Sequence, residues 1–122
     1  MQIVLATNNA HKLTEVRAIL AGCGLEVASP ADLGLELDVE EVGVTFRENA
    51  LLKAMACHRG TGLAALGDDS GLVVEALAGR PGVLSARYAG RHGDDAANTA
   101  RVLEELAALP GVSRAAAFVC SL

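Results

Sequence analysis

Two adjacent aspartates, Asp68 and Asp69, stand between the glycines Gly67 and Gly71, directly after the apolar run 63–66. The apolar run predicts a buried strand, and the glycines let the backbone turn there and approach a ligand closely. Paired carboxylates at the end of a strand are costly unless a cation binds them. Mg²⁺ is the usual cation, because it prefers one or two carboxylates together with substrate phosphates. The alternative is a turn whose acids are solvated.

The segment after the first apolar run is rich in hydrogen-bond donors and begins a helix pattern. Backbone N–H groups at a helix N-terminus attract anions, and asparagine, threonine and lysine side chains add donors and charge. The segment predicts a phosphate cradle without glycines, because neither a P-loop nor a Gly-rich dinucleotide fingerprint is present. Ordinary helix capping by Asn9 with a solvated Lys12 is the alternative. The cradle residues are Thr7, Asn8, Asn9, Ala10, His11 and Lys12.

Lys12 and Lys53 are the lysines among the ten basic residues, and a lysine supplies a compact ammonium on a flexible stem. Asn49 and Lys53 share a helix face, from which the lysine can reach a phosphate at the sheet edge. A surface lysine whose stem packs on apolar neighbours is the alternative. Glu40 and Glu41 precede this helix. They either favour its positive end or supply further metal ligands.

Other candidate groups carry weaker signals. Ser70 is expected to form a turn rather than act as a nucleophile, because no Gly-x-Ser-x-Gly motif or histidine base accompanies it. The histidines show no metal-ligand spacing. Arg87 could clamp a phosphate, whereas Tyr88 could stack on a base or pack in the core.

Length and composition limit the class of protein. With 122 residues, 52% hydrophobic and 2% aromatic, the chain is expected to form a single domain over 1–122 with an aliphatic core. A net charge of −5 argues against non-specific binding of nucleic acid or of acidic membranes. No run reaches the ~18 apolar residues of a membrane span. Cys23, Cys57 and Cys120 form no C-x-x-C pair, which predicts small buried side chains in a reducing cytosol.

Apolar periodicity predicts strands that alternate with helices, which is typical of an α/β layered sheet. Thr45 and Glu48 form a capping-box pattern at the start of the second helix. The expected strands span 2–6, 25–28, 63–66, 72–74 and 115–122, with an extended segment at 35–39, and the expected helices span 11–21, 45–59 and 94–109.

Read in order, three stretches resemble the Ham1 / inosine triphosphate pyrophosphatase family. They are Leu5–Lys12, Thr45–Ala54 and the segment from Asp68 to Gly90, which contains Asp68-Asp69-Ser70-Gly71-Leu72 and Pro81-Gly82-Val83-Leu84-Ser85-Ala86-Arg87-Tyr88-Ala89-Gly90. Their order and spacing also agree with the family, and the resemblance covers essentially the whole chain.

The resemblance implies an Mg²⁺-dependent enzyme that hydrolyses non-standard purine nucleoside triphosphates such as ITP, dITP and XTP. Water attacks the α-phosphorus, the products are the nucleoside monophosphate and pyrophosphate, and the activity cleans the nucleotide pool. The implied fold is a long mixed central sheet with flanking helices in two lobes, usually as a homodimer. A cytoplasmic location is expected.

Site residues are implied by position. Thr7 to Lys12 would hold the triphosphate, with Lys53 and Arg87 adding charge. Glu41 and Asp69 would hold Mg²⁺. Asp69 would also activate or orient the attacking water, and Ser70 would contact the substrate. Glu40 and Asp68 are further candidate metal ligands.

The chain also departs from the family. Family members continue into a region with a Phe-Gly-Tyr-Asp-Pro motif and a Ser-His-Arg motif that read the purine base, and neither motif occurs here. The sequence is therefore expected to be the N-terminal part of a family member. A truncated, catalytically impaired fragment that binds phosphate or nucleotide is the alternative to an active enzyme.

Overall fold

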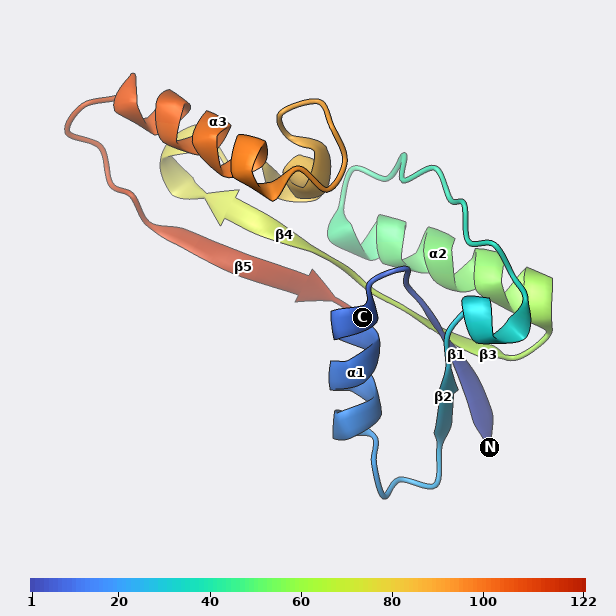
Figure 1. The fold of residues 1–122 in the computed structure, drawn as a ribbon. Helices are drawn as coiled ribbons and strands as arrows, with labels where there is room; N and C mark the ends of the chain where they lie inside the picture. Colours follow the sequence, from blue (N-terminus) through green and yellow to red (C-terminus); the bar gives the residue numbers. More distant parts are fainter. The chain divides into compact units, whose positions relative to one another are not determined.

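The structure, a computed structural model, describes residues 1–122 and divides into two units, which are described separately (Figure 1). Unit 1 is Met1–Asp68 with Leu122, and unit 2 is Asp69–Ser121. The elements of unit 1 are β1 (Gln2–Ala6), α1 (Ala10–Ile19), β2 (Glu26–Ala28), the 3₁₀ helix η1 (Ala31–Leu33), α2 (Phe46–Thr61) and β3 (Ala64–Gly67). Those of unit 2 are β4 (Asp69–Val74), η2 (Glu75–Leu77), η3 (Gly82–Arg87), α3 (Asp95–Ala107) and β5 (Ala116–Ser121). The expectation of a single domain stays a prediction.

In unit 1, β1 is the central strand of a parallel sheet of order β2-β1-β3 and is buried on both faces. Its side chains alternate, as the two-residue period of a strand requires. Ile3 and Leu5 pack with the apolar residues of α1, whereas Val4 and Ala6 pack with Cys57 of α2. Unit 1 is thus a helix–sheet–helix sandwich. The register aligns Ile3 with Val27 and Ala64, and Val4 with Ala28 and Ala65.

The helices of unit 1 begin and end at residues that the local sequence specifies. The Asn9 side chain accepts hydrogen bonds from N–H groups in the first turn of α1. The predicted capping pair of α2 is confirmed, because the Thr45 hydroxyl accepts the N–H of Glu48. The Glu48 carboxylate accepts the N–H of Val44, one residue outside the expected partner. Gly62, with φ +72°, ends α2 in the left-handed conformation that glycine tolerates.

Unit 2 pairs β4 with β5 in an antiparallel ladder and packs α3 together with η2 and Tyr88 around a small core. The Asp94 carboxylate caps α3 by accepting the N–H of Ala97. Tyr88 is 4% exposed, so its packing role is confirmed and stacking on a base from solvent is excluded. The buried core residues are Val74, Leu77, Tyr88, Val102 and Leu106.

The predicted α/β class, with a sheet and flanking helices, is confirmed. The segment 35–39 is not a strand, however, because Leu35 and Leu37 pack against the α2 face of the sheet instead of pairing with it. None of the helices combines the length and the apolar character that a membrane span requires.

The expectation of a turn at the acidic segment is wrong. Only Asp68 separates β3 from β4 along the chain, and Asp69 and Ser70 are strand residues. Neither Gly67 nor Gly71 has a positive φ. The reason is long-range, because Asp69 and Ser70 pair with β5 at the other end of unit 2, a partner that the local pattern cannot reveal.

The expectation that all three cysteines are buried is wrong for two of them. Cys57 is buried in α2, and burial raises the pKa of its thiol. Cys23 lies exposed in the turn between α1 and β2, and Cys120 is exposed on β5. All three thiols are free.

Gly67 is required by the close approach of α2 to β3. A Cβ at this position would lie 2.0 Å from the backbone oxygen of Ala50 and 3.0 Å from the Cβ of Ala54. A carbonyl inside a helix cannot move away without disturbing the hydrogen bonds of the helix. Gly67 therefore permits helix–strand contact and does not form a turn.

We expect Gly67→Ala to lower the free energy of unfolding by about 3 kcal/mol, because the methyl group overlaps backbone that cannot relax. Gly60→Ala is the matched control. A Cβ there would meet the Leu35 side chain at 2.8 Å, which can rotate away. Alanine also favours the helix by about 1 kcal/mol over glycine. Urea unfolding measures both variants, and equal stabilities would contradict the assignment.

Candidate functional site

The strand order of unit 1 reverses at β1. From β1 the chain crosses through α1 to β2 on one side, and then through α2 to β3 on the other side. Ala6 and Gly67 are register partners at the ends of β1 and β3, so the carboxyl ends of these strands lie together. Ligands of open α/β sheets bind outside the carboxyl ends of the strands at such a reversal. Lys12 and Asp68 follow these two strand ends.

Lys12 and Asp68 form an ion pair at this edge, from Nζ of the lysine to Oδ2 of the carboxylate. Asp68 is 4% exposed and Asp69 is 7% exposed, so the alternative of solvated turn acids is wrong. The Lys12 side chain retains 29% exposure. The lysine therefore contacts a buried carboxylate while its side chain remains accessible to a ligand from solvent.

The second carboxylate oxygen of Asp68, Oδ1, is buried and has no hydrogen-bond partner. A buried carboxylate oxygen without a partner is costly, and a hard divalent cation would satisfy it. No three histidine, cysteine, aspartate or glutamate side chains gather closely enough to hold a metal by themselves. Mg²⁺ fits such a donor set, because it uses one or two carboxylates and takes its other ligands from water and phosphate.

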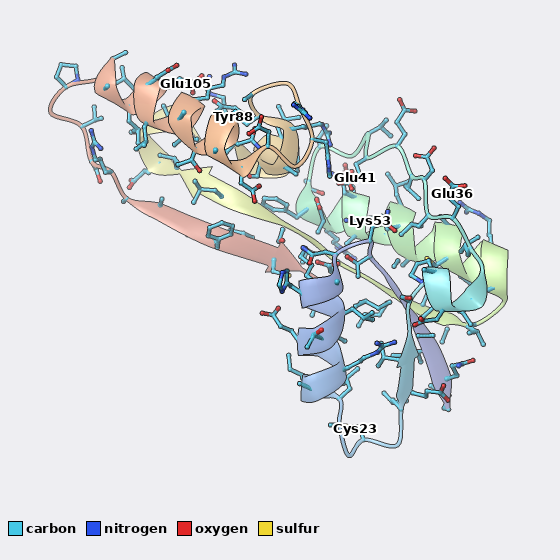
Figure 2. All side chains as sticks on the ribbon, in the orientation of Figure 1. Cys23, Glu36, Glu41, Lys53, Tyr88 and Glu105 are labelled. Atoms are coloured by element: carbon cyan, nitrogen blue, oxygen red, sulfur yellow. The ribbon has the colours of Figure 1, made fainter.

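Lys53 and Glu41 form the second lysine–carboxylate pair of unit 1. Nζ of Lys53 in α2 lies 3.5 Å from Oε1 of Glu41 in the preceding segment (Figure 2). The side chains are 13% and 24% exposed. The alternative of a surface lysine is therefore wrong, and Glu41 does more than favour the start of the helix. Glu40, its neighbour, is exposed.

Asn49 holds the acidic segment against α2, a role that the sequence reasoning missed. It is fully buried, and its Oδ1 accepts the N–H of Gly43 at 2.7 Å. A Cβ at Gly43 would lie 2.5 Å from that oxygen. The contact fixes the backbone close to Glu41, one helical turn from Lys53. In the sequence, this role of Asn49 is signalled only by its position on the same helix face as Lys53.

Asparagine and threonine side chains of the predicted phosphate cradle make hydrogen bonds to protein backbone, within the cradle segment and beyond it. Asn8 donates to the carbonyl of Leu37 at 3.0 Å, which ties the loop to the segment before α2. Asn9 Oδ1 accepts the N–H of His11 at 2.9 Å, and the Thr7 hydroxyl accepts the N–H of Asn9. Capping by Asn9 is therefore confirmed. Phosphate binding by this segment, whose residues 8–11 are exposed, stays a prediction.

The remaining predicted residues belong to unit 2. Asp69 is opposite Ser121 in the β4–β5 ladder, and Ser70 is the next residue of β4. Arg87 is the last residue of η3 and is half-buried. Their roles with the substrate stay predictions.

Tyr88 contacts two charged side chains of α3, of which Figure 2 labels Glu105. Its hydroxyl donates to Oε2 of Glu105 at 2.5 Å, and the Arg101 guanidinium lies 4.4 Å from the ring centroid. Burial and this hydrogen bond raise the pKa of Tyr88, and the same bond lowers the pKa of Glu105. Tyr88 is therefore a neutral donor that joins its segment to α3.

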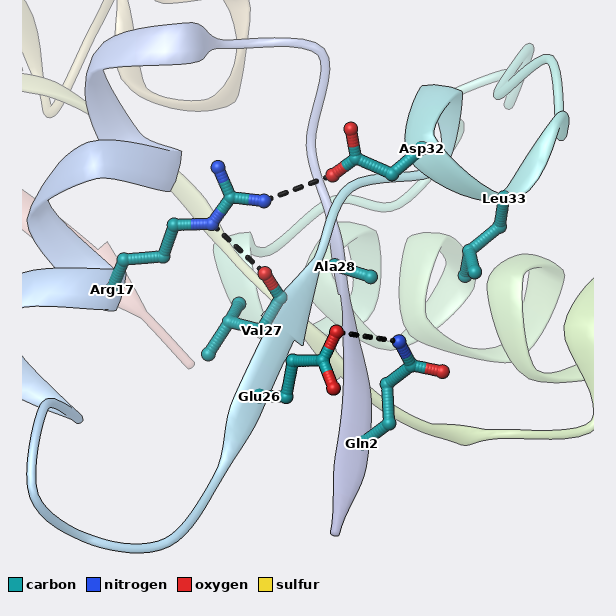
Figure 3. Close-up of a pocket in the computed structure, with 7 residues that line it drawn as sticks. All are labelled: Gln2, Arg17, Glu26, Val27, Ala28, Asp32 and Leu33. Carbon is teal, nitrogen blue, oxygen red and sulfur yellow. Dashed lines mark hydrogen bonds and ion pairs between the residues drawn. The ribbon is translucent and has the colours of Figure 1, made fainter.

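A pocket of about 550 Å³ in unit 1 contains none of the predicted site residues (Figure 3). Arg17 donates to the carbonyl of Val27 and to Asp32, both at 2.9 Å. Hydrogen bonds from Ser29, more than the arginine, lower the pKa of Asp32. These contacts hold α1 against β2. We therefore assign the polar residues that line the pocket a structural role. It is lined by Gln2, Arg17, Glu26, Val27, Ala28, Asp32 and Leu33.

Comparison with known sequences gives consistent matches. The sequence profile of the Ham1 family matches residues 3–122. A protein of Streptomyces avermitilis named dITP/XTP pyrophosphatase is 52% identical over an alignment of 123 positions, which covers 98% of this chain and 61% of that protein. A protein of the same name from Mycobacterium tuberculosis is 49% identical over an alignment of 126 positions, which covers 99% of this chain and 62% of that protein. The chain thus spans about three-fifths of the length of these relatives.

Solved structures agree with these matches. A HAM1 protein from Coxiella burnetii superposes with a TM-score of 0.90 at 42% identity, covering 98% of this chain and 60% of the other. A nucleoside-triphosphatase / dITP/XTP pyrophosphatase from Mycobacterium abscessus gives a TM-score of 0.81 at 49% identity, with coverages of 98% and 63%.

Lys12→Met would leave the buried Asp68 carboxylate without this ammonium group. We expect the free energy of unfolding to fall by about 3 kcal/mol, as for other broken buried pairs. Lys12→Met with Asp68→Asn removes both charges and should recover most of this loss. Urea unfolding of the single and double variants measures the effect. A double variant as unstable as the single one would show that the pair is not what stabilises this edge.

Proposed function

The chain belongs to the Ham1 family, and on this premise we propose that it hydrolyses non-standard purine nucleoside triphosphates to the monophosphate and pyrophosphate. The observation that carries the proposal is the pairing of both lysines with carboxylates, Lys12 with Asp68 and Lys53 with Glu41. Each pair joins a group suited to phosphate with a group suited to a divalent cation. An Mg²⁺–triphosphate complex offers the complementary charges to both.

The ion pairs suggest how the ligand is accepted. In the free protein, each carboxylate forms an ion pair with a lysine in partly buried surroundings. When a triphosphate binds, Lys12 and Lys53 exchange carboxylate partners for phosphate oxygens, and Glu41 and Asp68 become available to a cation. The charges are thus in place before the ligand arrives, which reduces the cost of ordering them.

Mg²⁺ is the cofactor that these donors fit. We assign Glu41 and Asp69 as its protein ligands, with Asp68 and Glu40 as further candidates. When bound, the ion neutralises charge that develops on the phosphates during bond cleavage. The assignment of a cation here is supported by Oδ1 of Asp68, which is buried and has no hydrogen-bond partner. Asp69 is the next residue in the chain.

Asp69 is proposed as the general base. It orients the attacking water and accepts its proton while the water oxygen bonds to the α-phosphorus. The bond from that phosphorus to the bridging oxygen breaks, and pyrophosphate leaves with the bonding electrons. Lys53 and Arg87 stabilise the negative charge on the leaving group, and Ser70 contacts the substrate. Thr7 to Lys12 hold the phosphate chain.

The substrate class comes from the relatives, which are named dITP/XTP pyrophosphatases. We propose ITP, dITP and XTP as substrates, removal of these nucleotides from the pool as the biological role, and a homodimer as the assembly. These assignments describe the activity for which the relatives are named. This chain spans about three-fifths of the length of those relatives.

A second candidate is a module that binds phosphate or nucleotide without turnover. This candidate is favoured by the set of residues assigned above. Each of them is assigned to bind phosphate, metal or water, and none is assigned to bind the purine base. Calorimetry with Mg²⁺ and ITP, ATP or pyrophosphate separates the candidates. Equal affinities without release of pyrophosphate would favour the binding module over the enzyme.

We expect the 122-residue chain to release pyrophosphate from dITP in the presence of Mg²⁺. Asp69→Asn should reduce the rate by about 10²–10⁴-fold, the usual contribution of a general base. Asp95→Asn, an exposed acid at the start of α3, is the matched control and should leave the rate unchanged. Undiminished turnover by Asp69→Asn would refute the role of Asp69.

A further inference from the structure

We propose that Asn98 is a positioning residue that holds Arg87 in the conformation in which it meets the phosphates. The inference rests on the proposed function, in which Arg87 contributes charge to triphosphate binding. Asn98 belongs to α3, and neither its position nor its residue type marked it as part of a site. Its role follows from what its amide group contacts.

Both ends of the Asn98 amide are bonded to the backbone that flanks Arg87. Its Oδ1 accepts the N–H of Ala89 at 2.8 Å, and its Nδ2 donates to the carbonyl of Ala86 at 3.1 Å. The side chain is 7% exposed, so these bonds are protected from water. One side chain thus spans residues 86–89, and Arg87 lies inside the spanned segment.

The same face of α3 makes further polar contacts with this segment. Arg101 donates to the backbone carbonyl of Tyr88 and lies over its ring, and Glu105 accepts the Tyr88 hydroxyl. Asn98, Arg101 and Glu105 are spaced by one helical turn each, so they lie along one stripe of the helix. The stripe runs beside the buried apolar residues of α3, Val102 and Leu106.

The interior of η3 is fixed to β4. The Ser85 hydroxyl accepts the N–H of Leu72 at 2.9 Å and donates to the carbonyl of Gly82 at 2.6 Å. The backbone on both sides of Arg87 is therefore held by side-chain hydrogen bonds before any ligand binds. Such preorganisation raises affinity because less conformational entropy is lost on binding.

The apolar core contacts of α3 are made by residues other than Asn98. The apolar contacts of α3 are made by Val102 and Leu106, which join Val74, Leu77 and Tyr88 in the core of unit 2. Asn98→Ala shortens the side chain to a methyl group, which keeps these apolar contacts and removes the two hydrogen bonds to the 86–89 backbone. A function-specific effect can therefore be separated from a loss of fold.

The test is a double-variant cycle on the 122-residue chain, with affinity for inorganic triphosphate in Mg²⁺ measured by calorimetry. We expect Arg87→Ala to weaken binding about tenfold or more, the effect of losing one charge-assisted hydrogen bond. Asn98→Ala should weaken binding about fivefold in the otherwise unchanged chain, and less than about twofold in the Arg87→Ala background. Thr99→Ala, exposed on the neighbouring position of α3, should leave affinity unchanged.

Each outcome decides something. Equal effects of Asn98→Ala in the two backgrounds, or no effect in either, would overturn the coupling of Asn98 to Arg87 while leaving the proposed function intact. No binding by the unchanged chain would overturn the proposed function, and this inference with it. If Asn98→Ala fails to fold, Asn98→Asp, which keeps the acceptor for Ala89 and loses the donor to Ala86, takes its place in the cycle.

Discussion

The burial of β1 on both faces is the constraint on which unit 1 depends. Ile3 and Leu5 need the cover of α1, whereas Val4 and Ala6 need the cover of α2. A strand covered on both faces requires crossover helices on opposite sides, which place β2 and β3 on either side of β1. That order brings the carboxyl ends of β1 and β3 together. Lys12, in the first turn of α1, follows the end of β1, and Asp68 follows the end of β3.

Each charged side chain that is buried at the carboxyl ends of β1 and β3 needs an opposite charge close to it. The Asp68 carboxylate is buried next to a glycine that lets α2 approach closely, so water cannot solvate it fully. Lys12 supplies the opposite charge, and Lys53 does the same for Glu41. Such pairs contribute little net stability, because desolvation offsets much of the attraction. Their value under the proposed function is that both signs of charge are already fixed in place for a metal–phosphate ligand.

Each unit also uses a buried asparagine to fix a segment to which the proposed function assigns a role. Asn49 accepts the N–H of Gly43 beside the acidic segment, and Asn98 spans the backbone around Arg87. Neither contact could be predicted from the sequence, because an asparagine inside a helix carries no local signal of its distant partner. The helix caps at Asn9 and Thr45 were predictable, since their partners lie within one turn.

The sequence by itself determined the α/β class, the start of α2, the packing of β1 and the set of residues suited to phosphate and metal chemistry. These features follow from local periodicity and from residue types close together in the chain. Only the tertiary structure decided that Asp68 pairs with Lys12, 56 residues away, and that Asp69 begins a strand rather than a turn. Both depend on contacts between segments far apart in the sequence. Burial and cross-strand pairing set them, and a local pattern contains neither.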